Sequence, residues 1–364
     1  MVSVTTASLF LALALTTQAQ EKEAPKSVAS PTAARVPSAE EVRKAAAAES
    51  KHLKNIRQVT FNFGRAGEGY FRPDGKGIIF QAAAPGEADY QIYTLELVLG
   101  AKPRMVSTGK GKCTCSYYRP DGRKILFGST HLDPALSESP STKDGTKPAK
   151  KGPAYSRSER YRWDFDTAMD IFMADPDGSN LVRLTDTPGY DAEGSWSPDA
   201  SQIIFTSFRD GNAEIYIMDA DGKNPRRITN AKGYDGGPFF SPDGKKIIYR
   251  SDRKENDLLQ LFINTPDGKN ERALTTNEAV NWGPFFWKDS RHLVYSTSVH
   301  GHSNYEIYWM DTESGKQTRI TFREGFDGLP VFNADGTKMM WTSKGRSADN
   351  TSQLFIADFV APQD

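Results

Sequence analysis

The sequence has few of the features that mark a protein with specialised chemistry. It carries two cysteines and five histidines, and its 46 basic residues are matched by 46 acidic ones, so the formal net charge is zero. A neutral chain lacks the bulk positive field that attracts nucleic acid or an anionic membrane surface. We therefore expect no nucleic-acid partner.

Several catalytic motifs are also missing. There is no Gly-x-Ser-x-Gly segment, which excludes an attached α/β-hydrolase domain. The chain has neither a phosphate-binding glycine motif nor a His-Glu-x-x-His segment. We therefore predict no catalytic residues.

Long hydrophobic runs are limited to the beginning of the chain. The run Leu9–Leu15 is followed by Thr17-Gln18-Ala19, which places small residues where a signal peptidase cleaves. The run is too short to span a bilayer, and no Lys or Arg precedes it. We expect a signal peptide over residues 1–19, export to the periplasm or beyond the cell, and no membrane insertion after cleavage.

A low-complexity segment separates this leader from the rest of the chain. Residues 20–37 are rich in Ala, Pro and Lys, a composition that predicts a disordered linker. Ser38 and Glu41 then form a capping-box pattern before a run of alanines. This pattern predicts a helix over residues 38–54, packed on the rim of the following domain or mobile.

What the sequence does contain is a turn motif of the Pro-Asp-Gly type, repeated six times. Pro presets φ, Asp bonds to nearby backbone N–H groups, and Gly accepts a positive φ. Steps of 47, 78, 44, 46 and 46 residues separate the six turn aspartates, which are Asp74, Asp121, Asp199, Asp243, Asp289 and Asp335. A period in the forties is typical of four-stranded units that close into a propeller.

The strand pattern also predicts how the ring closes. Each turn joins two β-rich runs, and a third strand and a fourth strand follow. The last third strand, Gln353 to Phe359, has no fourth strand after it, whereas Ile56 to Thr60 precedes the first turn. We expect this N-terminal strand to complete the last blade, which removes an exposed sheet edge. The predicted fold is all-β: a six-bladed β-propeller over residues 55–364 with four antiparallel strands per blade and an insertion at 132–166.

These repeats resemble the TolB-like propeller repeat of bacterial envelope proteins. The resemblance covers Ile56 to Phe359 and is clearest in Ser195-Trp196-Ser197-Pro198-Asp199 and in the segment from Ser207 to Tyr216. The N-terminal α/β domain of TolB has no counterpart here, so the role of that domain is not implied. In this family the TolB propeller binds a peptidoglycan-associated lipoprotein, related propellers regulate serine peptidases, and one branch contains pectate-fragment lyases with a metal site. A shared propeller does not by itself transfer any of these functions.

Polar residues recur in phase on the face opposite the turns, where second strands connect to third strands. Equivalent positions in a closed ring converge on a central channel, so this channel mouth is the predicted ligand site. The predicted ligand-binding residues are His131, Asp191, Glu193, Arg209, Asp235, Arg253, Asn281, Trp282, His300, His302 and Asp327. The structural alternative is that these Asp and Arg residues pair with one another or bond to loop backbone, and that the aromatic residues cover the blade ends.

Three of the five histidines, His131, His300 and His302, fall in the predicted mouth loops. Imidazole beside a carboxylate can hold a transition metal or act as a general base. Paired carboxylates such as Asp191 and Glu193 could perform acid–base work on a glycan. We expect no cofactor, with a divalent metal at the mouth as the alternative.

Two further features interrupt the repeats. Cys113 and Cys115 are two residues apart on a strand, which is at the long limit for a disulfide. They could form a metal or redox pair, or simply line the channel as small residues. The insertion 132–166 emerges at the mouth, where long loops often act as lids or binding loops. Its basic and aromatic part, Tyr155 to Phe165, could bind an acidic glycan, or the insertion could pack on the rim.

We predict an exported, monomeric, non-catalytic propeller that recognises an envelope protein, peptide or glycan at its channel mouth. The alternative is a polysaccharide lyase or hydrolase that uses the His and carboxylate residues of the same mouth.

Overall fold

The computed structural model describes residues 38–138, 165–254 and 257–363. The predicted signal peptide, the predicted linker and most of the insertion lie outside these residues. The described part contains one helix longer than a single turn, α1 (Ala39–Glu49), and no helix there is long and apolar enough to cross a membrane.

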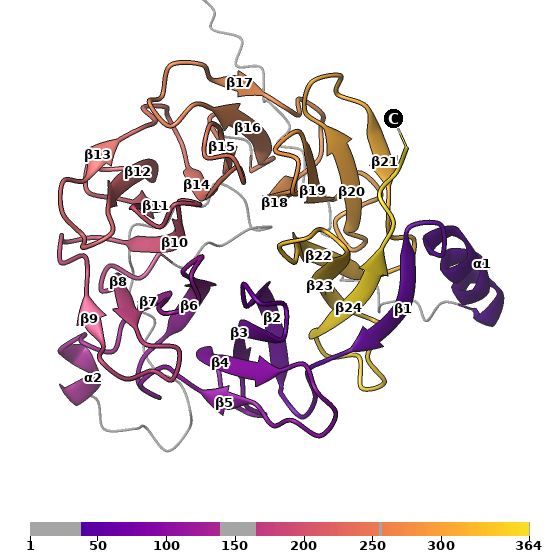
Figure 1. The fold of residues 1–364 in the computed structure, drawn as a ribbon, viewed down its shortest axis with the longest axis horizontal. Coiled ribbons are helices and arrows are strands. Elements are labelled where there is room, and N and C mark those ends of the chain that lie inside the picture. Colours follow the sequence, from indigo (N-terminus) through magenta and orange to yellow (C-terminus); the bar gives the residue numbers. More distant parts are fainter. Residues whose placement is uncertain (1–37, 139–164, 255–256, 364) are drawn as a thin grey trace, which may run out of the picture. The chain divides into compact units, whose positions relative to one another are not determined.

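The described strands form six antiparallel sheets of four strands, arranged around a centre (Figure 1). The first three blades are β2–β5 (Arg65–Phe71, Gly77–Ala83, Gln91–Glu96, Arg104–Met105), β6–β9 (Cys113–Tyr118, Ile125–Ser129, Asp170–Ala174, Val182–Arg183) and β10–β13 (Asp191–Trp196, Gln202–Ser207, Glu214–Asp219, Arg226–Arg227). The next two are β14–β17 (Asp235–Phe240, Ile247–Ser251, Gln260–Asn264, Arg272–Ala273) and β18–β21 (Asn281–Phe286, His292–Thr297, Glu306–Asp311, Gln317–Arg319). The sixth blade contains β22 (Phe326–Phe332), β23 (Lys338–Lys344), β24 (Gln353–Phe359) and β1 (Leu53–Gln58). The predicted six-bladed propeller is confirmed.

The N-terminal strand closes the ring as the strand pattern predicted. Strand β1 pairs antiparallel with β24, with Leu53 opposite Phe359 and Gln58 opposite Phe355. The first strand of each blade contacts the first strand of the next, and β22 contacts β2, so the innermost strands form a closed ring. The short helix α2 (Ala135–Glu138) lies in the connection between β7 and β8.

Each repeated turn is held by its aspartate. The Oδ1 atom of Asp74 accepts a hydrogen bond of 2.9 Å from the backbone N–H of Lys76. The turn aspartates of the other five blades accept the same bond from the residue two positions later: Arg123, Ser201, Lys245, Arg291 and Thr337. The turn chemistry predicted from the sequence therefore operates in all six blades.

Helix α1 packs against the sixth blade through its last residue. Ser38 caps the helix and forms the predicted capping box with Glu41. The helix ends at Glu49, earlier than the predicted Lys54, because Leu53 already pairs with Phe359 in the sheet. The buried Glu49 carboxylate contacts Arg346 at 2.5 Å and accepts a bond of 2.8 Å from the Phe322 N–H.

Candidate functional site

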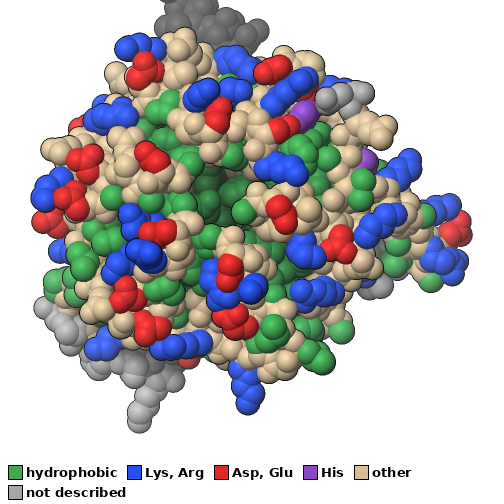
Figure 2. Space-filling model, viewed as in Figure 1, with side chains coloured by type: hydrophobic (Ala, Val, Ile, Leu, Met, Phe, Trp, Pro, Cys, Tyr) green, Lys and Arg blue, Asp and Glu red, His purple; other side chains and the backbone are tan. Residues whose placement is uncertain are grey.

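A cavity of about 640 Å³ occupies the central channel and is lined mainly by the innermost strands. Its wall includes Arg65 and Lys112 near the beginnings of these strands and Ala88, Asp89 and Tyr90 from the connection between β3 and β4. The cavity therefore extends toward the face opposite the Pro-Asp-Gly turns. The space-filling view in Figure 2 shows a central hollow lined by hydrophobic side chains and surrounded by charged ones.

An aromatic cluster narrows the channel toward the turns. Tyr70, Tyr117, Phe239 and Phe285 occupy the same repeat position, four residues before the turn aspartate. The ring centroids of Tyr70 and Tyr117 are 4.9 Å apart, and those of Phe239 and Phe285 are 5.3 Å apart. Tyr70 also lies 5.8 Å from Phe239, so rings from opposite sides of the channel meet. We call these four residues the aromatic floor.

Every innermost strand is bulged just above the aromatic floor. The pairing register of the first two strands shifts at this point in all six blades. The residue six positions before the turn aspartate has a left-handed φ of 45° to 60° in each blade: Glu68, Cys115, Glu193, Gly237, Gly283 and Leu329. All but Leu329 and the two glycines are polar, and all six line the cavity. The bulge turns these residues toward the channel.

Glu193 is held by four hydrogen-bond donors. Thr206 Oγ1 donates to it at 2.7 Å, Tyr234 Oη at 3.0 Å and the Gly237 N–H at 2.7 Å. The Arg250 guanidinium forms an ion pair with the same carboxylate and donates to Tyr234 Oη at 2.6 Å. Only 9% of the Arg250 side chain and 12% of the Glu193 side chain are exposed, so this charge pair is largely shielded from water. Removing either partner of such a pair leaves an uncompensated charge in the channel, which is strongly destabilising.

Two glycines of β14 make room for this pair. A Cβ atom on Gly237 would lie 1.9 Å from Arg250 Nη1, and a Cβ atom on Gly236 would lie 2.0 Å from Tyr234 Oη. Both distances are far shorter than a van der Waals contact. The absence of a side chain at Gly237 therefore leaves room for the Arg250 guanidinium, and its absence at Gly236 leaves room for the Tyr234 hydroxyl group.

Glu68 is the second glutamate of the cavity lining. Burial and the nearby charge of Glu193 raise the pKa of Glu68 to about 7. Tyr70 Oη donates a long hydrogen bond of 3.4 Å to its side chain, and Thr342 Oγ1 accepts one of 3.0 Å from its backbone N–H. Near neutral pH the Glu68 carboxyl group therefore exchanges between its protonated and ionised forms.

The two cysteines lie on the channel wall as free thiols. Cys113 is buried with its Sγ atom 3.3 Å from Ser129 Oγ, and Cys115 occupies the bulge position with its Sγ atom 3.2 Å from Thr114 Oγ1. Burial raises the pKa of both thiols, and nearby carboxylates raise that of Cys115 further. Thiols in this state are protonated and weak nucleophiles. The interpretation of the pair as small residues lining the channel agrees with their position.

Several predicted binding residues form ion pairs outside the cavity lining. Asp191 Oδ2 lies 3.2 Å from Arg209 Nη2, and Asp327 Oδ2 lies 2.6 Å from Arg346 Nη2. In both blades the aspartate is one of the first two residues of the first strand, and the arginine follows the second strand. Burial raises the pKa of Asp191, and the arginine opposes the shift. These pairs agree with the alternative given in the sequence analysis, in which the repeated Asp and Arg residues pair with one another instead of binding a ligand.

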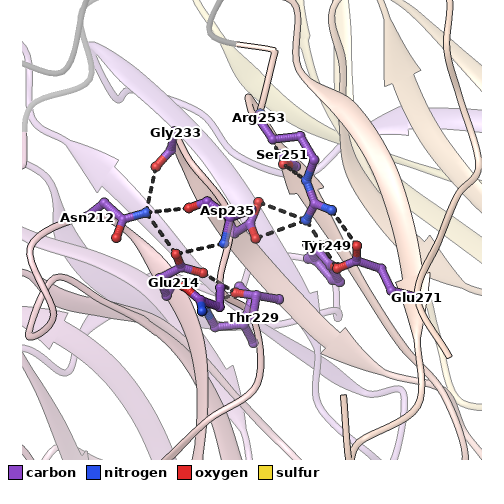
Figure 3. A network of polar contacts seen from close by, with 12 residues as sticks. Asn212, Glu214, Thr229, Gly233, Asp235, Tyr249, Ser251, Arg253 and Glu271 are labelled. Atoms are coloured by element: carbon purple, nitrogen blue, oxygen red, sulfur yellow. Dashed lines mark hydrogen bonds and ion pairs between the residues drawn. The ribbon is translucent and has the colours of Figure 1, made fainter. Parts of the chain in front are cut away.

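A third pair of this kind, Asp235 with Arg253, belongs to a larger polar network (Figure 3). Arg253 lies 3.1 Å from Asp235 and also pairs with Glu271 on β16–β17. Burial raises the pKa of Asp235 to about 6, although Arg253 opposes the shift. In the same view Glu214 of the preceding blade accepts a bond of 2.6 Å from Thr229 Oγ1. The backbone N–H of Asp235 donates to the Ala213 carbonyl of that preceding blade at 3.0 Å, so the network links two neighbouring blades.

The remaining predicted residues lie in different surroundings. Asn281 is buried and donates to Asn277 at 2.8 Å, whereas Trp282 lines the cavity. His131 Nδ1 lies 2.9 Å from Ser129 Oγ, and His300 Nε2 lies 2.8 Å from Tyr308 Oη. Burial lowers the pKa of both imidazoles. The exposed His302 lies in the connection between β19 and β20. Of the eleven predicted residues, Glu193 and Trp282 line the cavity.

No three His, Cys, Asp or Glu side chains in the described part of the chain lie close enough together to hold a metal ion.

At the described end of the insertion, the ring centroid of Phe165 lies 5.2 Å from that of Tyr190 and 5.7 Å from that of Tyr234. This anchors the return of the insertion beside the channel wall.

Arg250 is a channel residue that sequence reasoning missed. It lies seven residues after the turn aspartate, where the other blades have Gln81, Gly128, Thr206, Ser296 and Thr342. In four blades this side chain accepts a hydrogen bond from the bulge N–H of the next blade, that of Glu68, Cys115, Gly237 or Leu329. An arginine cannot accept such a bond. In the sequence, the arginine at a repeat position where four other blades carry a hydrogen-bond acceptor was the feature that could have identified Arg250.

Comparisons with known proteins agree with this fold. The family model described as the TolB beta propeller domain matches residues 162–276 and 208–301, which is less than half of the chain. No curated protein matches in sequence. Among solved structures, TolB from Acinetobacter baumannii gives a TM-score of 0.55 at 19% identity, covering 76% of this chain and 57% of that one.

Two further structures are similar at the level of fold. The putative TolB from Agrobacterium tumefaciens gives a TM-score of 0.53 at 19% identity, covering 81% of this chain and 91% of that one. Hydrazine synthase from Kuenenia stuttgartiensis gives 0.52 at 16% identity, covering 73% of this chain and 39% of that one. This chain thus spans a little over half the length of the Acinetobacter protein and much less of the hydrazine synthase. Identities this low support the fold alone: the chain is a six-bladed β-propeller, and its residues 162–276 and 208–301 match the TolB beta propeller domain.

Proposed function

We propose that this chain is an exported binding protein that recognises an envelope protein, peptide or glycan inside the channel cavity, without catalysing a reaction. The observation that carries the proposal is the cavity itself. Its volume of about 640 Å³ lies within the range of ligand pockets, and its wall combines aromatic rings with a few fixed charges.

The arrangement of charge supports binding rather than chemistry. Glu193 and Arg250 neutralise each other and are fixed by Tyr234 and the Gly236-Gly237 segment. A preorganised polar group orients a ligand at little entropic cost. Trp282 and Tyr190 add aromatic surface on the cavity wall. The periplasm or the exterior of the cell is the proposed location, on the strength of the signal-like N-terminal segment and the TolB-type repeats.

Binding to the cavity can be tested with purified protein, envelope extract and defined peptidoglycan fragments and peptides. Trp282→Ala removes aromatic surface from the wall, and Arg65→Ala removes an exposed cation from the rim. The matched control is Lys223→Ala, an exposed residue at the turn between β12 and β13 on the opposite face. We expect the two cavity variants to lose a ligand that the control retains. Equal capture by all the variants would overturn the proposal.

The alternative is an enzyme that acts on a polysaccharide, and Glu68 is the observation that favours it. A carboxyl group with a pKa of about 7 beside a second glutamate, Glu193, has the acid–base character that glycoside chemistry uses. Turnover of an oligosaccharide panel by the wild type, abolished in Glu68→Gln, would favour the enzyme over the binding protein.

A further inference from the structure

The two glutamates at bulge positions of the channel have different surroundings. Glu193 is saturated by an ion pair with Arg250 and by three further donors. The Glu68 side chain accepts the long hydrogen bond from Tyr70 and a hydrogen bond from the thiol of Cys115, which is a weak donor. A ligand that enters the cavity therefore meets Glu68 as the carboxylate with capacity for a strong new hydrogen bond.

The backbone at Glu68 is strained in order to present this side chain. Its φ of 45° lies in the left-handed region, which costs a non-glycine residue on the order of 1 kcal/mol. The equivalent bulges at Gly237 and Gly283 show that glycine adopts the same conformation in this ring. Cys115, Glu193 and Leu329 adopt the same conformation in their blades, so the bulge presents whichever side chain it carries to the channel, and in the first blade that side chain is a carboxylate.

The surface next to Glu68 is aromatic. Tyr70 lies two residues further along β2, and its ring contacts Tyr117 at 4.9 Å and Phe285 at 6.3 Å. Leu329 and Val331 add aliphatic surface to the same wall. Aromatic faces attract cations, and an apolar wall packs well against an alkyl chain that carries a charged end.

We propose that the inner end of the channel binds a primary alkylammonium group, the chemistry of a lysine side chain, with Glu68 as its counter-ion and the aromatic floor around its alkyl chain. This inference rests on the proposed binding function and specifies the ligand class for that site. The channel accommodates the group as the deepest part of a larger envelope ligand. A peptide lysine is the source to which we commit, because the apolar wall suits an alkyl stem better than a hydroxylated sugar ring.

The ionisation of Glu68 gives the proposal a pH signature. Charged and titratable groups face it from several strands: Glu193, Arg250, Cys115, Tyr70 and Tyr90. Because the pKa of Glu68 is about 7, its carboxylate is mostly protonated at pH 6 and mostly ionised at pH 8. An alkylamine stays protonated throughout this range. Its affinity should therefore increase as the pH rises.

The test uses n-butylamine, n-butanol and glucosamine as probes, with calorimetry on the purified wild type. We expect n-butylamine to bind at least about tenfold more tightly than n-butanol at pH 8 and to weaken toward pH 6, because a hydrogen bond to a charged group is lost. Glu68→Gln should abolish both the preference and the pH dependence. Glu87→Gln, in the exposed loop between β3 and β4, is the matched control and should leave both unchanged.

Three results would overturn the inference: equal binding of amine and alcohol, an unchanged affinity in Glu68→Gln, or tighter binding of glucosamine than of n-butylamine. If n-butylamine fails to bind but an envelope ligand still depends on Trp282, the ammonium site is wrong and the channel-binding function stands. If no ligand depends on Trp282 or Arg65, the proposed function itself fails.

Discussion

The hydroxyl group of Thr60 accepts a hydrogen bond of 2.9 Å from the backbone N–H of Leu354, near the opposite end of the chain. Thr60 Oγ1 also donates to Gln353 Oε1 at 2.8 Å. The same backbone-to-hydroxyl bond links the third and fourth strands of the other blades, from Ile92 to Ser107, Ile171 to Thr185, Ile215 to Thr229, Leu261 to Thr275 and Ile307 to Thr321. The N-terminal strand therefore reproduces the bond made by a continuous blade.

Thr60→Ala should destabilise the closed ring by about 1–2 kcal/mol, because the buried Leu354 N–H loses its partner. Urea unfolding monitored by tryptophan fluorescence measures the change. Thr60→Ser keeps the hydroxyl group and should retain most of the stability, and Thr275→Ala removes the same bond within a continuous blade. An unaltered midpoint for Thr60→Ala would show that the closure does not depend on this bond.

Gly237→Ala should destabilise the protein more than Gly75→Ala does. Both glycines have a positive φ, so each substitution costs about 1 kcal/mol from backbone conformation. A Cβ atom on Gly75 meets nothing within 4 Å, whereas one on Gly237 would collide with Arg250. The excess loss of unfolding free energy in Gly237→Ala measures this collision. Equal losses in the two variants would contradict the packing described for Arg250.

Arg250→Met should cost about 3 kcal/mol of stability, because it leaves Glu193 in the channel without its cation. Adding Glu193→Gln removes the unbalanced charge and should restore part of the loss. The four proteins form a double-mutant cycle, measured by denaturant unfolding. Strictly additive losses would mean that the two side chains do not interact energetically.

Glu68→Gln should stabilise the protein at high pH and not at low pH. The folded pKa of about 7 is above the usual glutamate pKa of 4.5, so the folded state binds this proton more tightly than the unfolded state. The stabilising contribution is complete below pH 4.5 and is lost as the pH rises through 7. We therefore expect the variant to exceed the wild type by up to about 3 kcal/mol at pH 8. Unfolding curves at several pH values test this, and a difference that does not change with pH would refute the assignment.

Glu49→Ala should release helix α1 from the sixth blade. A carboxylate at the last position of a helix is unfavourable with respect to the helix dipole, and the Arg346 ion pair offsets this. We expect a loss of about 2 kcal/mol and faster proteolysis near the helix. Glu40→Ala alters an exposed pair with Lys44 in the first turn and serves as the control. Equal protease resistance of both variants would show that Glu49 does not anchor the helix.

The repeats allowed much of the fold to be predicted because their chemistry is local. A turn aspartate bonds to a backbone N–H two residues later, and strands joined by short turns pair with each other. The way the ring closes was predictable because no fourth strand follows Gln353–Phe359 in the sequence, and because Ile56–Thr60 precedes the first blade as an extra strand. The helix end was misplaced by a few residues, because the pairing of Leu53 with Phe359 overrides the helical propensity of the alanine-rich segment.

The candidate site was only partly predictable. Phase analysis identified Glu193 and Trp282, but it treated Asp191 and Arg209 in the same way, although they pair within a blade away from the cavity. The position of a residue within the repeat predicts how far along the channel axis it lies, but it does not predict the direction in which its side chain points.

By itself, the sequence determined the six blades, the turns and the closing strand, because each depends on contacts between neighbouring segments. Only the tertiary structure decided which polar residues share the channel. The ion pair between Glu193 of β10 and Arg250 of β15, and the hydrogen bond from the Gly237 N–H to Glu193, form where strands from separate blades meet. Such encounters depend on the closed ring as a whole, which no single repeat encodes.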